Sequence, residues 1–286
     1  MPVPMRDGTK LATNIWRPDA DGPVPTLLVR NPYSKQQVTT YGYTSPNIFV
    51  LVEAGYAVAV QDTRGTFCSE GTFVPHVDDA GDGADTVAWL TEQDWCDGNV
   101  GSWGASYLGF VQWQTAATGV AGLRAMAPAV TSADLYRAPW HSPGGALSLD
   151  CLLAWTTLMS ANELQRRLAT GEGDPSDMVG LGAAMADLTV LSDRTPVAEQ
   201  PLLGTYLPWV VDQVIGHPDR DATWEALSSI DRVGLLLPLG THLLVGLGDT
   251  PDRAAGSVAA ALAAHLQDEQ RSAGPRTPPP PTAPTP

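Results

Sequence analysis

A strand-to-helix turn around Ser106 constrains the fold of this chain more than any other feature. Residues 99–110 read Asn-Val-Gly-Ser-Trp-Gly-Ala-Ser-Tyr-Leu-Gly-Phe, so an apolar strand at 100–103 runs through a glycine to the serine, and a helix begins near Tyr107. In a nucleophile elbow, a serine on such a turn projects its hydroxyl into a cleft. Strand and helix approach closely there, which requires small residues. This chain supplies Gly104, Ala105 and Gly109.

The turn residues do not by themselves decide between a catalytic and a structural role. The generic elbow motif has glycine two positions after the serine, whereas this chain has Leu108 there. Taken alone, Gly-x-Ser-Tyr-x-Gly predicts a catalytic elbow or an ordinary glycine-rich turn with equal weight.

Strands alternate with helices along residues 1–130. Apolar runs and alternating patterns predict strands at 11–16, 26–29, 56–60, 100–103 and 123–128. Helical patterns cover 47–53, 82–91 and 107–117. Continuous apolar runs are typical of strands covered on both faces, as in a parallel sheet. The pattern predicts an α/β core, with Ser106 at the carboxyl end of a strand, where sites form in such sheets.

The remaining chain changes character twice. Residues 131–227 carry helical patterns at 147–158, 180–188 and 207–215, which predict an inserted helical cap. Residues 228–270 predict a partial return to the core, with a last strand at 242–246 and a helix at 253–267. From 271 to 286 the chain is proline-rich and is predicted to be a disordered tail. Residues 225–286 contain no Trp, Tyr or Phe, although the whole chain is 7% aromatic.

Composition excludes several classes of protein. The chain has 16 basic and 31 acidic residues, a net charge of −15, so it would repel a nucleic acid. No apolar run reaches the roughly 18 residues of a membrane span, and no secretory signal pattern opens the chain. The three cysteines, Cys68, Cys96 and Cys151, lack metal-type spacing. We therefore expect a cytoplasmic protein without metal or cofactor that binds neither nucleic acid nor membrane; its oligomeric state is left open.

An acyl-transfer serine needs a base and an acid that orients the base, in the order serine, acid, histidine for this fold. Asp249 follows a short apolar segment, as an acid at a strand end would, but a turn aspartate in Gly-Asp-Thr-Pro explains it equally well. Only His265 follows Asp249, and it lies within a predicted helix. The other histidines precede Asp249 and are expected in loops, the cap or the last strand: His76, His141, His217 and His242.

Several motifs together resemble one family. They include Asn31-Pro32-Tyr33, Gln61-Asp62-Thr63-Arg64-Gly65, Trp95-Cys96-Asp97-Gly98-Asn99, Gly104-Ala105-Ser106-Tyr107-Leu108-Gly109, Ala133-Asp134-Leu135-Tyr136 and Glu199-Gln200-Pro201-Leu202-Leu203-Gly204. These segments are similar to the Xaa-Pro dipeptidyl-peptidase and α-amino acid ester hydrolase family, within the α/β-hydrolases. The resemblance covers roughly residues 1–233. It also accounts for Leu108, because the elbow of this family is Gly-x-Ser-Tyr-x-Gly.

The resemblance implies a set of site residues. Ser106 would be the nucleophile, and the Tyr107 amide and Tyr33 hydroxyl would form the oxyanion hole. Trp140 and Trp155 would line an acyl pocket suited to an aromatic acid; as an alternative or in addition, they are cap-core tryptophans. The Asp-Thr-Arg-Gly turn at 62–65 is interpreted as an ion-paired support of the site.

The chain departs from the family after the cap. The family carries its acid in a Gly-Trp-aromatic-Asp segment and its histidine in a Gly-Pro-Trp-x-His segment, and this chain has neither. Gly246-Leu247-Gly248-Asp249 is a partial counterpart of the first, and the family's carboxyl-terminal β-sandwich has no counterpart. We therefore predict an α/β-hydrolase fold whose last strands and β-sandwich are missing or altered, with a frameshift near Val233 as one hypothesis.

The sequence thus predicts a serine hydrolase of small-molecule carboxylic esters. One alternative is an Xaa-Pro dipeptidyl-peptidase-type hydrolase, because a triad does not distinguish esters from amides by motif. Another is an inactive, truncated or frameshifted homologue that lacks the catalytic histidine.

Overall fold

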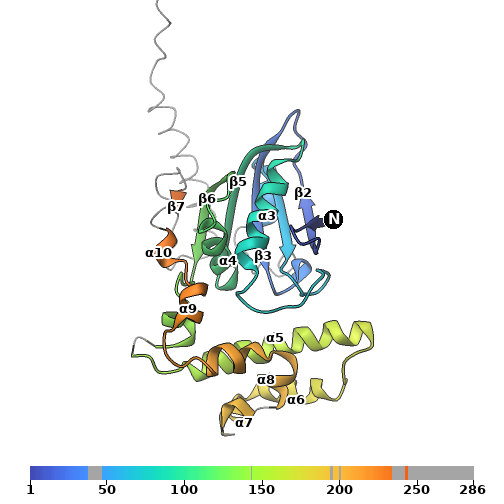
Figure 1. The fold of residues 1–286 in the computed structure, drawn as a ribbon. Coiled ribbons are helices and arrows are strands. Elements are labelled where there is room, and N and C mark those ends of the chain that lie inside the picture. The colour runs from blue at the N-terminus through green and yellow to red at the C-terminus, as the bar shows by residue number, and fades with distance from the viewer. Residues whose placement is uncertain (38–46, 143, 194–195, 200, 234–241, 244–286) are drawn as a thin grey trace, which may run out of the picture.

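The protein is built around a twisted, mixed β-sheet (Figure 1). The computed structural model describes residues 1–37, 47–142, 144–193, 196–199, 201–233 and 242–243. Within these ranges the sheet has the strand order β1-β2-β4-β3-β5-β6-β7. Its strands are β1 (Pro2–Pro4), β2 (Lys10–Trp16), β3 (Val24–Asn31), β4 (Ala57–Asp62), β5 (Cys96–Ala105), β6 (Leu123–Ala129) and β7 (His242–Leu243).

The strands that bear the site are parallel. β3 pairs in parallel with β4 and β5, and β5 with β6, whereas β2 pairs antiparallel with β1 and β4. In the β5–β6 register Ala105 lies opposite Ala129, so both strands end together, just before Ser106. Parallel strands collect their carboxyl ends at one edge of a sheet, and this is where the elbow lies.

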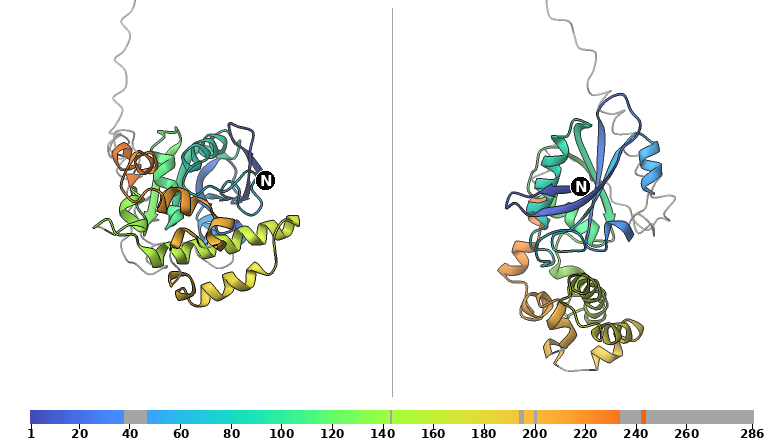
Figure 2. Two further views of the ribbon diagram at one scale, coloured as in Figure 1. Left: turned by 60° about the horizontal axis from the view of Figure 1, so that its bottom comes forward. Right: turned by 90° about the vertical axis from the view of Figure 1, so that its right-hand side faces the viewer.

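Helices cover both faces of the sheet, which explains the continuous apolar runs. Leu27 of β3 packs on the face that carries α2 (Ile48–Glu53), and the next residue, Leu28, packs on the face that carries α3 (Asp79–Thr91). α4 (Tyr107–Ala116) runs beside α3. The two further views show α2 on the side opposite α3 (Figure 2). Successive side chains of a strand point to opposite faces, so a strand buried on both faces needs apolar residues throughout.

A group of helices lies beyond the carboxyl edge of the sheet (Figure 1). Its helices are η1 (Tyr136–Trp140), α5 (Leu149–Thr170), α6 (Asp177–Ala186), α7 (Thr189–Ser192), η2 (Val197–Glu199), α8 (Pro201–Tyr206), η3 (Val210–Ile215) and α9 (Ala222–Leu227). A short helix, α10 (Ile230–Val233), follows α9, and β7 pairs in parallel with β6. The helical segment predicted between residues 131 and 227 is thus a layer over the elbow end of the sheet, and its longest helix, α5, runs well past the predicted end at 158.

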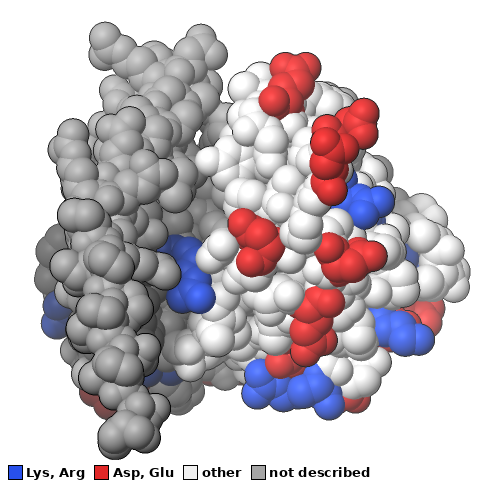
Figure 3. Space-filling view, turned by 90° about the horizontal axis from the view of Figure 1, so that it is seen from above, with Lys and Arg blue, Asp and Glu red and all other residues white. Residues whose placement is uncertain are grey.

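Charged residues are mixed on the surface. Figure 3 shows acidic side chains spread over the face seen from above, with basic side chains among them. No helix among the described residues is both long and apolar enough to cross a membrane. Asp249, His265, the predicted helix at 253–267 and the proline-rich tail lie outside the described residues.

Candidate active site

Ser106 sits in a strained turn between β5 and α4. Its backbone has φ 57° and ψ −124°, a combination that is unfavourable for a residue with a Cβ atom. The Ser106 N–H donates to the Ala129 carbonyl at 3.0 Å, and the Ser106 carbonyl accepts from the Phe110 N–H at 3.0 Å, so β6 and α4 both hold the turn. Such strain persists only where the surrounding structure imposes it, and it is concentrated at functional sites.

Missing side chains let the strand and helix approach at this turn. A Cβ atom added to Gly104, which has φ +140°, would lie 2.5 Å from the Leu108 Cβ. A Cβ atom on Gly109 would lie 2.6 Å from the Thr131 Cγ2. Leu108, which the generic motif does not predict, is therefore accommodated by the absent side chain of Gly104.

Tyr33 reaches the elbow from the loop after β3. The Asn31 side chain accepts from the Tyr33 N–H at 2.9 Å, which fixes the loop at its start. The Tyr33 hydroxyl accepts from the Trp155 Nε1–H at 3.0 Å, and it lies near enough to the Ser106 side chain for the serine to lower the pKa of Tyr33. Burial raises the pKa of Tyr33, so the phenol stays protonated at neutral pH.

The Asp-Thr-Arg-Gly turn at 62–65 stabilises this loop through hydrogen bonds and ion pairs. Asp62 accepts from the Lys35 N–H at 2.6 Å and from its Nζ at 3.0 Å. Arg64 pairs with Asp82 at 2.6 Å and Asp7 at 2.7 Å. The turn is ion-paired, in agreement with the interpretation from sequence, and it links the Tyr33 loop to α3.

The side-chain hydroxyl and the backbone N–H of Tyr107 have different roles. Its hydroxyl donates to Asp79 Oδ2 at 2.6 Å and accepts from the His76 N–H at 3.0 Å, which anchors the start of α4 in the core. Burial, followed by the nearby Asp79 carboxylate, raises the pKa of Tyr107. Its backbone N–H is the first of the helix and has no acceptor within it, so it is available to an anion beside Ser106.

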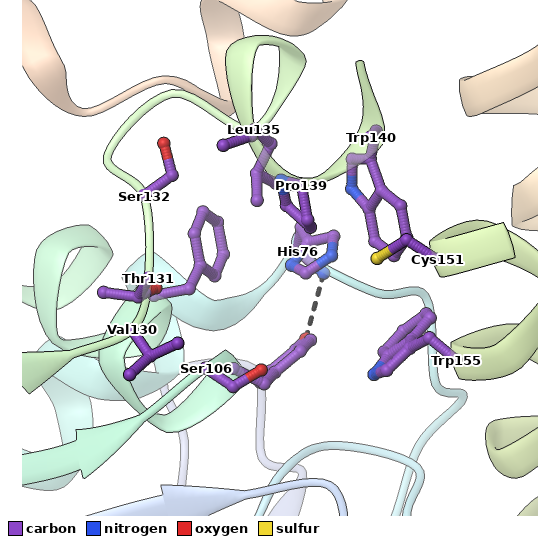
Figure 4. Close-up of a pocket in the computed structure, with 13 residues that line it drawn as sticks. His76, Ser106, Val130, Thr131, Ser132, Leu135, Pro139, Trp140, Cys151 and Trp155 are labelled. Carbon is purple, nitrogen blue, oxygen red and sulfur yellow. Dashed lines mark hydrogen bonds between the residues drawn. The ribbon is translucent and has the colours of Figure 1, made fainter. Parts of the chain in front are cut away.

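A cavity of about 400 Å³ opens beside Ser106 (Figure 4). Trp140 from η1 and Trp155 from α5 stand in its wall, with ring centroids 5.3 Å apart. The remaining lining residues are His76, Ser106, Tyr107, Phe110, Val130, Thr131, Ser132, Leu135, Ala138, Pro139 and Cys151. The cavity is therefore largely aromatic and aliphatic, and none of these lining residues is a carboxylate or a Lys or Arg.

The structure brings most of the predicted site residues together. Ser106, Tyr107, Trp140 and Trp155 line one cavity, and Tyr33 contacts its edge through Ser106 and Trp155. The proposed acid Asp249 and the candidate base His265 lie outside the described residues, and only the backbone of His242 is described, in β7. His141 stacks on Tyr136 and His217 pairs with Asp221, as expected for structural cap residues; neither lines the cavity.

Sequence reasoning missed His76 as a residue of the site. Its side chain is only 4% exposed and lines the cavity beside Ser106. The ring lies 4.6 Å from the Phe110 ring centroid and 5.2 Å from that of Trp209. These rings come from distant segments of the chain, so no local spacing indicates the contact.

The fold is that of an α/β-hydrolase. A model of the X-Pro dipeptidyl-peptidase (S15) family matches residues 7–264, so the chain belongs to that family. The match continues past Val233, where the resemblance noted from the motifs ends.

One sequence relative and two solved structures support the assignment to this family. A cocaine esterase from Rhodococcus sp. (strain MB1 Bresler) is 55% identical over 246 residues, which are 86% of this chain and 42% of that enzyme. A solved α-amino acid ester hydrolase is 25% identical with a TM-score of 0.61, covering 94% of this chain and 45% of the other. A CocE/NonD family hydrolase from Staphylococcus aureus is 25% identical with a TM-score of 0.55, over 80% of this chain and 37% of the other. The chain thus spans less than half the length of these relatives.

Proposed function

We propose that this protein hydrolyses carboxylic esters through an acyl-enzyme formed on Ser106. The observation that carries the proposal is the strained Ser106 turn beside an aromatic cavity, with the Tyr33 hydroxyl and the Tyr107 N–H next to the serine. The Rhodococcus relative, a cocaine esterase, supports the ester as substrate class.

The proposed chemistry follows from the placement of these groups. Ser106 Oγ attacks the ester carbonyl, and the negative charge that develops on the carbonyl oxygen is stabilised by two donors, the Tyr107 N–H and the Tyr33 hydroxyl. The positive end of the α4 dipole at Tyr107 favours the same charge. The alcohol leaves, and water then releases the acid from Ser106.

The acyl group is proposed to be aromatic and uncharged. Trp140 and Trp155 offer flat apolar surfaces on which a benzoyl-type ring can pack. Dipeptidyl-peptidase action is the second candidate, favoured by the family match. It requires a partner for the substrate's terminal ammonium, because a buried unpaired charge is costly. The lining residues described for the cavity include no carboxylate, and this favours the ester.

The base and acid of the triad stay predictions. His76 lines the cavity, but burial lowers its pKa to about 3, so it is a poor proton acceptor at neutral pH. Asp249 remains the proposed acid. The alternative hypothesis that the experiment must exclude is an inactive homologue without a catalytic base.

Labelling with a fluorophosphonate probe tests the nucleophile directly. We expect the folded full-length protein to be labelled and the S106A variant to remain unlabelled, because only an activated serine attacks the probe at a useful rate. S132A serves as the matched control, since Ser132 lines the same cavity but lies outside the elbow; its labelling should be unchanged.

Two outcomes would contradict the proposal. No labelling of a sample that shows a cooperative thermal transition would indicate the inactive homologue. Labelling that persists in S106A would place the reactive group elsewhere. The rates at which the protein hydrolyses 4-nitrophenyl benzoate and an Xaa-Pro anilide are then compared, and this comparison distinguishes esterase from peptidase action.

A further inference from the structure

His76 carries polar atoms that the folded protein leaves without partners. Among the described residues, neither Nδ1 nor Nε2 has a hydrogen-bond partner, although the side chain is only 4% exposed. A buried polar group without a partner costs about 1–3 kcal/mol. An apolar side chain of similar size would avoid this cost, so packing alone does not explain a histidine here.

The surrounding structure fixes this imidazole in place. The His76 backbone has φ 70°, a strained conformation for a non-glycine residue, and its N–H donates to the Tyr107 hydroxyl at 3.0 Å. The ring stacks on Tyr107 at 4.7 Å between centroids. The same tyrosine thus anchors both His76 and the start of the elbow helix, which ties the ring to the position of Ser106.

His76 lines the cavity beside a residue with a second buried polar atom, Trp140. Figure 4 shows His76 and Trp140 side by side in the cavity wall, and their ring centroids are 6.1 Å apart. Among the described residues, the buried Trp140 Nε1 also lacks a hydrogen-bond partner. Besides the hydroxyls of Ser106, Thr131 and Ser132, the residues that line the cavity therefore carry two neighbouring buried polar groups, an imidazole and an indole N–H.

We propose that His76 is a specificity-determining residue that hydrogen-bonds a hydroxyl group on the ring of the bound acyl group. The proposal rests on the ester hydrolysis proposed above and names its substrate class as esters of hydroxylated aromatic acids. A neutral imidazole has one donor and one acceptor nitrogen, and a hydroxyl can serve either. A charged substituent fits poorly, because none of the residues described as lining the cavity is an oppositely charged partner.

Binding to an inactive protein tests the proposal without requiring turnover. The full-length S106A variant would be titrated with methyl benzoate and with its 3-hydroxy and 4-hydroxy derivatives. Binding would be measured through the fluorescence of the cavity tryptophans. We expect at least one hydroxylated ester to bind about tenfold more tightly than methyl benzoate. A hydrogen bond to a buried polar group that otherwise has no partner changes the dissociation constant by about this factor.

Substitutions assign the preference to the imidazole. In S106A/H76F the preference should fall to within about twofold while methyl benzoate still binds, and S106A/H76Q, which keeps a donor and an acceptor, should retain part of it. S106A/H141F is the matched control, because His141 is also buried and stacked on an aromatic ring but lies outside the cavity; it should keep the full preference.

Three results would overturn the proposal. Equal affinities for all the esters in S106A, or an undiminished preference in S106A/H76F, would remove the role of His76 and leave the proposed esterase function intact. Absence of saturable binding by any ester would show that this cavity is not the acyl pocket, which would refute both proposals together.

Discussion

Three residues at the site hold conformations or environments that folding alone would not favour. Ser106 has a strained backbone at φ 57°, and His76 combines φ 70° with buried ring nitrogens. Tyr33 keeps a buried hydroxyl whose pKa is raised by burial. The strained backbones of Ser106 and His76 and the unpartnered His76 nitrogens cost stability, so their concentration around one cavity is itself an argument that the cavity binds a substrate.

Removing the Tyr33 hydroxyl tests the oxyanion hole. We expect Y33F to lower kcat for 4-nitrophenyl benzoate by about 100-fold with little change in KM, because the donor acts on charge that develops in the transition state. Y136F is the control, since the Tyr136 hydroxyl bonds the Pro218 carbonyl at 2.9 Å in the cap and does not line the cavity. A loss confined to KM would show that Tyr33 binds the ground state only.

The buried His76 makes stability depend on pH in a defined direction. Burial lowers its pKa from 6.5 to about 3, so between these values the unfolded chain binds a proton that the folded protein does not. The free energy of unfolding therefore falls as the pH decreases below 6.5, by about 2 kcal/mol at pH 5 from this group.

Urea unfolding at pH 7.5 and pH 5 measures this contribution. The unsubstituted protein should lose about 2 kcal/mol more than H76Q over this interval, because glutamine does not titrate. Equal losses in the two proteins would mean that the folded state accepts the proton on His76 as readily as the unfolded chain does.

At the scale of elements, the elbow depends on how closely β5 and α4 approach. The β5–β6 register ends both strands before Ser106, and Gly104 and Gly109 supply the space that lets α4 start at once. The Asp62–Lys35 and Arg64–Asp82 ion pairs hold the Tyr33 loop and α3 against this end of the sheet. Ser106 and the Tyr33 loop are thus positioned by regular elements and by buried polar contacts between them.

Replacing a glycine by alanine should lower stability where the added methyl group meets other atoms, and should not where the space around it is open. In G104A the new Cβ would lie 2.5 Å from the Leu108 Cβ at φ +140°, so we expect a loss of about 3 kcal/mol and a melting temperature lower by roughly 6–10 °C. In G182A the new Cβ meets nothing within 4 Å inside α6, and the higher helix propensity of alanine should raise stability by about 0.5–1 kcal/mol. Equal melting temperatures for the two variants would refute the steric account of the elbow.

At the scale of the whole molecule, the cavity exists only where the cap meets the sheet. Ser106 and His76 come from the core, and Trp140 and Trp155 come from the cap. The Trp155–Tyr33 hydrogen bond at 3.0 Å joins α5 of the cap to the loop after β3. Cap and core therefore form the cavity together.

The frameshift hypothesis is a prediction about the encoding DNA. If the frame changes near the codon for Val233, an alternative frame downstream should encode stretches that resemble Gly-Trp-aromatic-Asp and Trp-x-His. Sequencing the gene decides the matter, and absence of such stretches in every frame would refute the hypothesis. The family match through residue 264 in the frame as given weighs against a change of frame as early as Val233.

The sequence alone determined the alternation of strands and helices, the elbow at Ser106 and the acidic balance of charge. These features are local: they depend on the order of apolar residues, on glycine spacing and on composition. The resemblance of short motifs added Tyr33, Trp140 and Trp155, because each is carried by a recognisable segment. For these reasons the core was predictable, together with the cavity residues Ser106, Tyr107, Trp140 and Trp155.

Only the tertiary structure decided what surrounds the serine. His76 enters the cavity because Tyr107 and Phe110 of α4 and Trp209 before η3 converge on it, and Trp155 meets Tyr33 across 122 positions of chain. The continuation of α5 to Thr170 was likewise not predicted. Periodicity reports which side of an element is buried, whereas the partner of that side is set by how the elements pack. The polar groups that would select a substrate belong to this second kind of information.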